Sequence, residues 1–141
     1  MIRSASAQWT GGLKGGKGTL LTLSGALSSV PYSFSMRFEE SPGTNPEELI
    51  AAAHAGCFTM QLSALLEKAG YVADKLDTQA KVTFEKVGEA FTVTKSDLTL
   101  NAKVPRIDQA QFQAIAEEAK RICPISRLLN LKMTLDARLE K

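Results

Sequence analysis

Hydrophobic and polar residues alternate clearly over positions 31–38 of this chain. Every second side chain there is large and apolar and the residues between are polar, Tyr32, Phe34, Met36 and Phe38 against Ser33, Ser35 and Arg37. A period of two indicates a half-buried β-strand. We therefore expect a strand at 31–38, with Arg37 on the face opposite the apolar side chains.

Further strands are indicated on both sides of this segment. Weak alternation at 3–9 and an apolar run at 19–27 predict two strands, which the glycine-rich loop 11–18 joins into a hairpin. The second half of the chain predicts three more strands, 76–86, 91–102 and 131–139. The first two of these form a second hairpin, with its turn at 87–90.

The uncharged, largely apolar stretch 49–66 predicts a buried helix. Asn45 is a good N-cap, Pro46 suits the first helical position, and Glu48 completes an asparagine version of the capping box. Gly70 is the expected stop signal. The helix is apolar nearly all round, which implies burial on several sides.

Two shorter helices are expected after the second hairpin. Asp108 is the predicted N-cap of a helix at 109–121, where apolar residues recur at helical spacing. Pro124, directly after Cys123, suits the first position of a short helix that extends to Leu129. The order βββ-α-ββ-αα-β, with strands in hairpins, favours an α+β fold over a doubly wound α/β fold.

Composition limits the classes of protein to which the chain can belong. Its 141 residues, 44% of them apolar, suit a single domain over 1–141 that buries a core without disulfides. The formal net charge of +2, with scattered lysines and arginines, gives no indication of nucleic-acid binding. The N-terminus lacks the apolar region of a secretory signal. His54 and Gln61 make the uncharged stretch a core helix rather than a membrane span.

Two features suggest ligand sites only weakly. The run from Gly11 to Gly18 is nearly a phosphate loop, but it lacks a Ser or Thr after Lys17 and precedes a predicted strand, so we interpret it as a hairpin loop. One histidine and two widely separated cysteines do not make a zinc site, which needs about three or four protein ligands. No metal is expected.

Cys57 lies in the middle of the uncharged helix. A buried cysteine is often inert, and this one is about three turns into its helix, too far for the helix dipole to activate it. A guanidinium within hydrogen-bond reach would lower its pKa by about 1–3 units. Arg37 is the best candidate for that charge, and Glu47 could orient it through a bidentate pair. The alternative is an Arg37–Glu47 ion pair that only fastens strand to helix.

Other interpretations of the cysteines stay open. His54 precedes Cys57 by three residues, so the two could form the nucleophile pair of a hydrolase or transferase, although a core or interface histidine is the simpler interpretation. Cys123 lies beside a helix start, which depresses a thiol pKa, and is either a resolving thiol or a buried residue next to a cap. A third hypothesis is a stress-linked binding or structural dimer with inert thiols. In a reducing cytosol, two cysteines are more often thiols or redox-active groups than structural staples.

The string GTNPEELIAAAHAGCF at 43–58 resembles the signature of the OsmC/Ohr family, the osmotically inducible protein C and organic hydroperoxide resistance proteins. CPIS at 123–126 resembles the second cysteine motif of that family. Three other segments also fit, GGKGT at 15–19, PYSFSMRFE at 31–39 and MTLDARL at 133–139. A histidine three residues before the first cysteine, and an arginine on the strand before the helix, resemble the OsmC branch.

The resemblance implies an OsmC-like fold, with antiparallel sheets packed on a long central helix in an intertwined homodimer. It implies a thiol peroxidase without metal, haem or flavin. Cys57 would be the peroxidatic thiolate, Cys123 the resolving thiol, Arg37 the activating guanidinium and Glu47 its orienting carboxylate. The expected partners are an organic hydroperoxide or, more weakly, hydrogen peroxide, and an external dithiol reductant of the lipoyl or thioredoxin type. The expected setting is cytoplasmic defence against oxidative or osmotic stress.

Overall fold

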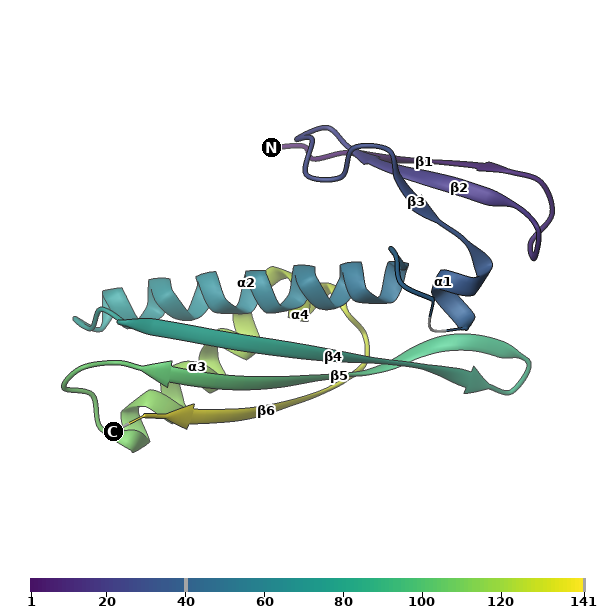
Figure 1. Ribbon diagram of the computed structural model, residues 1–141. Coiled ribbons are helices and arrows are strands. Elements are labelled where there is room, and N and C mark those ends of the chain that lie inside the picture. Colours follow the sequence, from purple (N-terminus) through teal and green to yellow (C-terminus); the bar gives the residue numbers. More distant parts are fainter. Residues whose placement is uncertain (40, 141) are drawn as a thin grey trace. The chain divides into compact units, whose positions relative to one another are not determined.

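The computed structural model describes residues 1–39 and 41–140 of the chain. Two compact units are present, an N-terminal unit (Met1–Leu49) and a C-terminal unit (Ile50–Lys141). The elements follow in the order β1 (Ala5–Thr10), β2 (Lys17–Thr22), β3 (Val30–Tyr32), α1 (Phe34–Phe38), α2 (Pro46–Lys68), β4 (Lys75–Val87), β5 (Ala90–Lys103), α3 (Gln109–Ile122), α4 (Pro124–Leu128) and β6 (Lys132–Leu139) (Figure 1). This mixture of two sheets and separate helices is the α+β class that the sequence predicts.

The N-terminal unit is built on a small antiparallel sheet in the order β1-β2-β3. Trp9 of β1 and Tyr32 of β3 pack across the central strand, with ring centroids 5.2 Å apart. Gly18 of β2 lies between these rings, and a Cβ atom at this position would clash with both of them. The glycine therefore lets the two aromatic side chains meet over the sheet.

The predicted strand at 31–38 is wrong in its second half, where the chain forms the short helix α1. The Ser33 hydroxyl caps this helix by accepting a hydrogen bond of 3.3 Å from the Met36 N–H. The two phenylalanines of α1 are four residues apart, and their ring centroids lie 4.8 Å from each other. Apolar residues at this spacing satisfy a helical pattern as well as a period of two, and the serine cap favours the helix. Arg37 consequently lies on a helix rather than on a strand.

The strand predicted at 19–27 is shorter than expected, because the chain turns after Thr22. The Gly25 N–H donates to the Thr22 carbonyl over 3.0 Å, and the Leu27 N–H donates to the Thr22 hydroxyl over 2.9 Å. Gly25 has a φ of +79°, a conformation that glycine adopts without steric cost. These local hydrogen bonds end the strand despite the apolar residues that follow.

Helix α2 begins and ends where the sequence predicts. The Glu48 N–H donates to the Asn45 side-chain oxygen over 2.8 Å, which is the expected N-cap. Gly70 follows the helix in the left-handed conformation, with a φ of +88°. The sequence also predicts a loop at 39–44, before this helix, and Glu40 of that loop lies outside the described residues.

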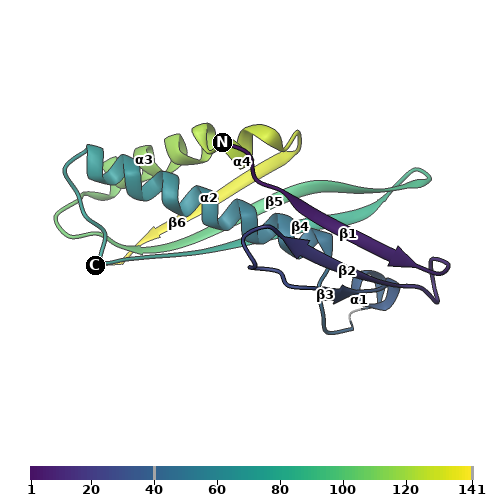
Figure 2. The ribbon, with the colours of Figure 1, turned by 90° about the horizontal axis from the view of Figure 1, so that it is seen from above.

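The C-terminal unit contains the sheet β4-β5-β6, with α2, α3 and α4 packed on it (Figures 1 and 2). β4 and β5 form the predicted antiparallel hairpin, with a register shift between Thr83 and Phe84. β5 and β6 are parallel, although both sheets were expected to be antiparallel. The reason is the connection, because α3 and α4 carry the chain back along the sheet before β6 begins, and such a crossover produces a parallel neighbour.

The core of the C-terminal unit is formed between α2, β5 and α3. Its largest fully buried apolar side chains are Phe58, Leu62, Leu66, Leu98, Leu100 and Phe112. In α2 they recur every four residues and so share one face of the helix. By length and composition α2 could span a membrane, but this buried face is that of a core helix. Met60 of α2 is 77% exposed, so burial on several sides stays a prediction about a second subunit.

Candidate active site

The fold brings the two cysteines into contact. Cys57 in α2 and Cys123 between α3 and α4 are 66 positions apart in sequence, and their sulfur atoms are 3.0 Å from each other. Both are thiols, with Cys57 half-buried and Cys123 fully buried. A disulfide requires a sulfur–sulfur distance of about 2.05 Å, so about 1 Å of movement would join them.

The backbone of Cys123 links two helices. Its N–H donates to the Ala119 carbonyl over 3.0 Å and closes α3, while its carbonyl accepts from the Arg127 N–H over 3.0 Å and opens α4. Pro124 suits the first position of α4 because that position needs no N–H donor. Cys123 is thereby held at a helix junction, facing the middle of α2.

The two thiols have different acidities because hydrogen bonds surround them unequally. Burial raises the pKa of Cys57, and the hydrogen bond with Cys123 raises it further. Burial also opposes ionisation of Cys123, but hydrogen bonds from Cys57, from the backbone and hydroxyl of Ser126 and from the Ile125 N–H together lower its pKa. The surroundings within the C-terminal unit thus favour the first thiolate on Cys123. An additional positive charge close to Cys57 would favour a thiolate there.

The predicted ion pair between Arg37 and Glu47 is present in the N-terminal unit. Arg37 Nη2 donates to Glu47 Oε1 over 2.8 Å, and Arg37 Nε lies 3.2 Å and 3.3 Å from the two carboxylate oxygens. The Arg37 side chain is 39% exposed and that of Glu47 only 12%. These hydrogen bonds from two nitrogens orient the guanidinium plane. The Arg37 Cζ atom also lies 5.3 Å from the centre of the Phe38 ring.

The structure therefore contains two separate pairs of predicted residues. Arg37 and Glu47 meet within the N-terminal unit, and Cys57 and Cys123 meet within the C-terminal unit. The activating role of the guanidinium toward Cys57 stays a prediction.

His54 is a fully buried residue with both ring nitrogens engaged. Nδ1 lies 2.8 Å from the Ser96 hydroxyl and Nε2 lies 2.9 Å from the Ser126 hydroxyl. Burial lowers the pKa of the imidazole, which favours its neutral form. Because both nitrogens already have partners, this is the geometry of a core histidine rather than of a base for Cys57.

Sequence reasoning assigned no role to either serine. Ser126 lies within the second cysteine motif, three residues after Cys123, and this position was the one available signal. Ser96 is an ordinary polar residue within a strand pattern. Only the packing of β5 against α2 reveals it as a partner of His54.

A cavity of about 270 Å³ opens beside Arg37 in the N-terminal unit. Its other lining residues are mainly aromatic or apolar, Trp9, Leu13, Tyr32, Ser33, Phe34 and Phe38. An apolar wall beside one oriented cation suits a small ligand with an organic body and one polar end.

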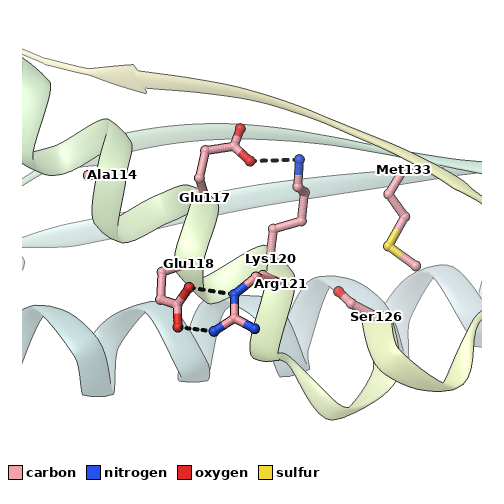
Figure 3. A pocket seen from close by; sticks show the side chains of 7 residues that line it. All are labelled: Ala114, Glu117, Glu118, Lys120, Arg121, Ser126 and Met133. Atoms are coloured by element: carbon pink, nitrogen blue, oxygen red, sulfur yellow. Dashed lines mark hydrogen bonds and ion pairs between the residues drawn. The ribbon is translucent and has the colours of Figure 1, made fainter.

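A second cavity, of about 450 Å³, lies in the C-terminal unit and has Ser126 in its wall (Figure 3). The charged residues beside it are paired along α3, Lys120 with Glu117 at 2.7 Å and Arg121 with Glu118 at 2.6 Å. These pairs leave little net charge for a ligand. Among the described residues, no group of three or more His, Cys, Asp or Glu side chains could hold a metal ion.

An α+β chain with two thiols in contact is a dithiol protein. The family described as OsmC-like protein matches residues 38–137, and the chain belongs to this OsmC family. Peroxiredoxin OsmC of Escherichia coli (strain K12) is 46% identical over 138 residues, which cover 98% of this chain and 96% of that protein. An organic hydroperoxide resistance protein of Xanthomonas axonopodis pv. citri (strain 306) is 31% identical over 98 residues, 66% of each chain.

Solved structures support the same fold. The crystal structure of an OsmC-like protein from Mycoplasma pneumoniae matches with a TM-score of 0.78 over 100% of this chain and 99% of that chain, at 12% identity. An organic hydroperoxide resistance protein from Elizabethkingia anophelis matches with a TM-score of 0.73 at 24% identity, over 99% of both chains. The OsmC-like fold that the sequence predicts is confirmed.

Proposed function

We propose that this chain is a thiol peroxidase that reduces organic hydroperoxides, and hydrogen peroxide more weakly, in defence against oxidative or osmotic stress. The observation that carries the proposal is the separation of 3.0 Å between the sulfurs of Cys57 and Cys123. Two thiols at this distance can pass from a sulfenic acid to a disulfide with little movement. Peroxiredoxin OsmC and an organic hydroperoxide resistance protein are named relatives of the chain.

In the proposed cycle, Cys57 is the peroxidatic residue, since it is the more accessible of the two thiols. Its thiolate attacks the terminal oxygen of the hydroperoxide, the O–O bond breaks, and the alkoxide takes up a proton and leaves as alcohol. Cys57 is then a sulfenic acid. The Cys123 thiolate attacks that sulfur, the S–O bond breaks, and hydroxide leaves and becomes water. The product is the Cys57–Cys123 disulfide.

Arg37 is proposed to supply the positive charge that Cys57 needs. Burial and the hydrogen bond with Cys123 raise the pKa of Cys57, which works against its role as nucleophile. A nearby guanidinium would lower that pKa by about 1–3 units and reverse the preference. The bidentate contact with Glu47 supports an orienting role for this carboxylate, because it limits the directions in which the guanidinium can point.

The preference for organic hydroperoxides rests on the aromatic cavity beside Arg37. Its volume of about 270 Å³ would accommodate a small organic body, whereas hydrogen peroxide would leave the apolar wall uncovered. Burying apolar substrate surface contributes about 25 cal/mol per Å². An alkyl or aryl hydroperoxide would therefore bind more tightly than hydrogen peroxide.

The remaining parts of the proposal concern partners and assembly. An external dithiol of the lipoyl or thioredoxin type would reduce the disulfide by thiol–disulfide exchange, with no prosthetic group. We further propose a single OsmC-like domain over residues 1–141, since the family match at 38–137 crosses the boundary between the two units. A cytoplasmic homodimer would cover the exposed side of α2 around Met60.

The test is peroxide consumption with a dithiol reductant, using cumene hydroperoxide and hydrogen peroxide in parallel. We expect Cys57→Ser to be inactive. Cys123→Ser should reduce one equivalent of peroxide and form no intramolecular disulfide. Arg37→Met should slow the first step by about 3- to 50-fold, because the lost thiolate fraction is partly offset by the greater nucleophilicity of a more basic thiolate.

Other outcomes would support other functions. Equal activity of wild type and Cys57→Ser would refute the peroxidase. Two thiols that react slowly with an alkylating reagent across the pH range would favour a non-enzymatic binding dimer. Hydrolase or transferase turnover that His54→Ala abolishes would favour the Cys57–His54 pair, although the engaged ring nitrogens argue against it.

A further inference from the structure

His54 connects the elements that carry the two cysteines. The residue lies in α2, three positions before Cys57, and Ser126 lies in α4, three positions after Cys123. The hydrogen bond of 2.9 Å between His54 Nε2 and the Ser126 hydroxyl joins these two segments across 72 sequence positions. Both side chains are buried, His54 at 0% exposure and Ser126 at 7%.

The protons shared by Ser96, His54 and Ser126 can be arranged in two ways. A neutral imidazole has one N–H donor and one bare nitrogen that accepts. If Nε2 carries the proton, it donates to Ser126, and the Ser96 hydroxyl, 2.8 Å from Nδ1, donates to the ring. If Nδ1 carries the proton, Nε2 is the acceptor and the Ser126 hydroxyl must donate its own hydrogen to it.

The first arrangement leaves the Ser126 proton available for another acceptor. Cys123 lies at the start of the same short helix, three positions before Ser126, and the Ser126 hydroxyl and backbone N–H both act to lower the pKa of its thiol. A fully buried thiolate depends on such donors, since water cannot solvate it. Of the two tautomers, the one with the proton on Nε2 leaves the Ser126 hydroxyl able to donate toward Cys123.

We infer that His54 is a positioning residue for disulfide formation, where it holds the Ser126 hydroxyl as a donor to the Cys123 sulfur. The inference rests on the proposed thiol peroxidase. In the step concerned, the Cys123 thiol loses its proton, the thiolate forms the S–S bond to the Cys57 sulfenic acid, the S–O bond breaks, and the leaving hydroxide takes up one proton to become water. Cys123 is oxidised and the Cys57 sulfur is reduced by one formal unit each.

The experiment separates the two chemical steps in a single turnover with one equivalent of cumene hydroperoxide. Peroxide loss reports sulfenic acid formation at Cys57, and non-reducing electrophoresis reports disulfide closure. In Ser126→Ala, we expect the first step within about twofold of wild type and closure slowed by about 10- to 100-fold, the effect of losing a hydrogen bond to a charged group. Excess peroxide should then convert Cys57 of this variant to sulfinic acid, which mass spectrometry detects.

Ser96→Ala is the matched control. It removes the hydrogen bond between the buried Ser96 hydroxyl and Nδ1 of the same imidazole, but it leaves Nε2 able to donate to Ser126. We expect Ser96→Ala to close the disulfide within about threefold of wild type and Ser126→Thr, which keeps the hydroxyl, to restore most of the rate. Closure at the wild-type rate in Ser126→Ala, or equal slowing in both alanine variants, would overturn the inference.

Two additions keep the result decisive. If Ser126→Ala does not fold, His54→Gln and His54→Leu replace it. We expect the disulfide to close faster in His54→Gln than in His54→Leu, because the glutamine amide can still donate to Ser126. If wild type consumes no hydroperoxide, the proposed function fails, and oxidised dithiothreitol then tests the positioning through a mixed disulfide at Cys57. Equal closure rates in wild type and Ser126→Ala would refute the positioning there too.

Discussion

Oxidation of the two thiols should stabilise the fold by an amount that the chain length between them determines. The bond would close a loop of 66 positions, and for this length the loss of unfolded-chain entropy corresponds to about 4 kcal/mol at 25 °C. The sulfurs must approach by about 1 Å, and any strain from this movement reduces the gain. We expect oxidised wild type to unfold with a free energy about 2–4 kcal/mol higher than the reduced protein.

The assay is urea unfolding of the same preparation, once treated with one equivalent of cumene hydroperoxide and once kept in excess dithiothreitol. Protein concentration must be identical, because the stability of the proposed dimer would depend on it. Cys123→Ser is the matched control and should show no stabilisation. By linkage, the native dithiol should also be oxidised at a potential about 40–90 mV lower than the unfolded chain.

The reasoning fails if oxidised and reduced wild type unfold at the same urea concentration. It also fails if the treated protein contains the bond only between chains, because the predicted loop would then not exist. A gain of similar size in Cys123→Ser would show that the treatment stabilises the protein by another route.

Three further predictions concern the fold. Acidification from about pH 7 to 5 should lower the unfolding free energy by up to about 1.4 kcal/mol per pH unit. The reason is that burial lowers the pKa of His54, so that below about pH 6.5 the unfolded chain binds a proton at this residue and the folded chain does not. Since His54 is the one histidine, His54→Gln should flatten this slope in urea titrations, and an unchanged slope would contradict it. Leu62→Ala should cost about 2–5 kcal/mol and Met60→Ala below about 1 kcal/mol in the monomer, and equal losses would refute the assigned buried face. Asn45→Ala should cost about 1 kcal/mol by thermal unfolding, and Asn45→Asp, which keeps the acceptor for the Glu48 N–H, should not.

The elements that sequence reasoning located best are those with local end signals. Helix α2 has its acceptor at Asn45 and its left-handed stop at Gly70, both within a few residues of the ends they define. Asp108 marks the start of α3 in the same way, with its carboxylate accepting from the Gln111 N–H over 2.9 Å. Such signals need no tertiary contact and can therefore be recognised in a single sequence.

The segment before α2 shows where a local pattern is ambiguous. The apolar residues of 31–38 fit a strand by their period of two, and Phe34 and Phe38 also fit a helix by their spacing of four. The Ser33 cap, with its hydrogen bond to the Met36 N–H, accompanies the helical solution. Over so short a segment, the alternation of polar and apolar residues does not by itself distinguish a strand from a helix.

The sequence by itself determined that this is an α+β chain with a long apolar helix, and that Cys57, Cys123, Arg37 and Glu47 are its candidate site residues. Tertiary structure decided which of them meet within each unit and what surrounds the thiols. Cys57 and Cys123 are in contact although 66 positions separate them in sequence. His54 forms hydrogen bonds with Ser96 and Ser126, which are 42 and 72 positions away. Acidity depends on burial and on donors from distant segments, so the opposite pKa shifts of the two thiols could only come from the folded chain.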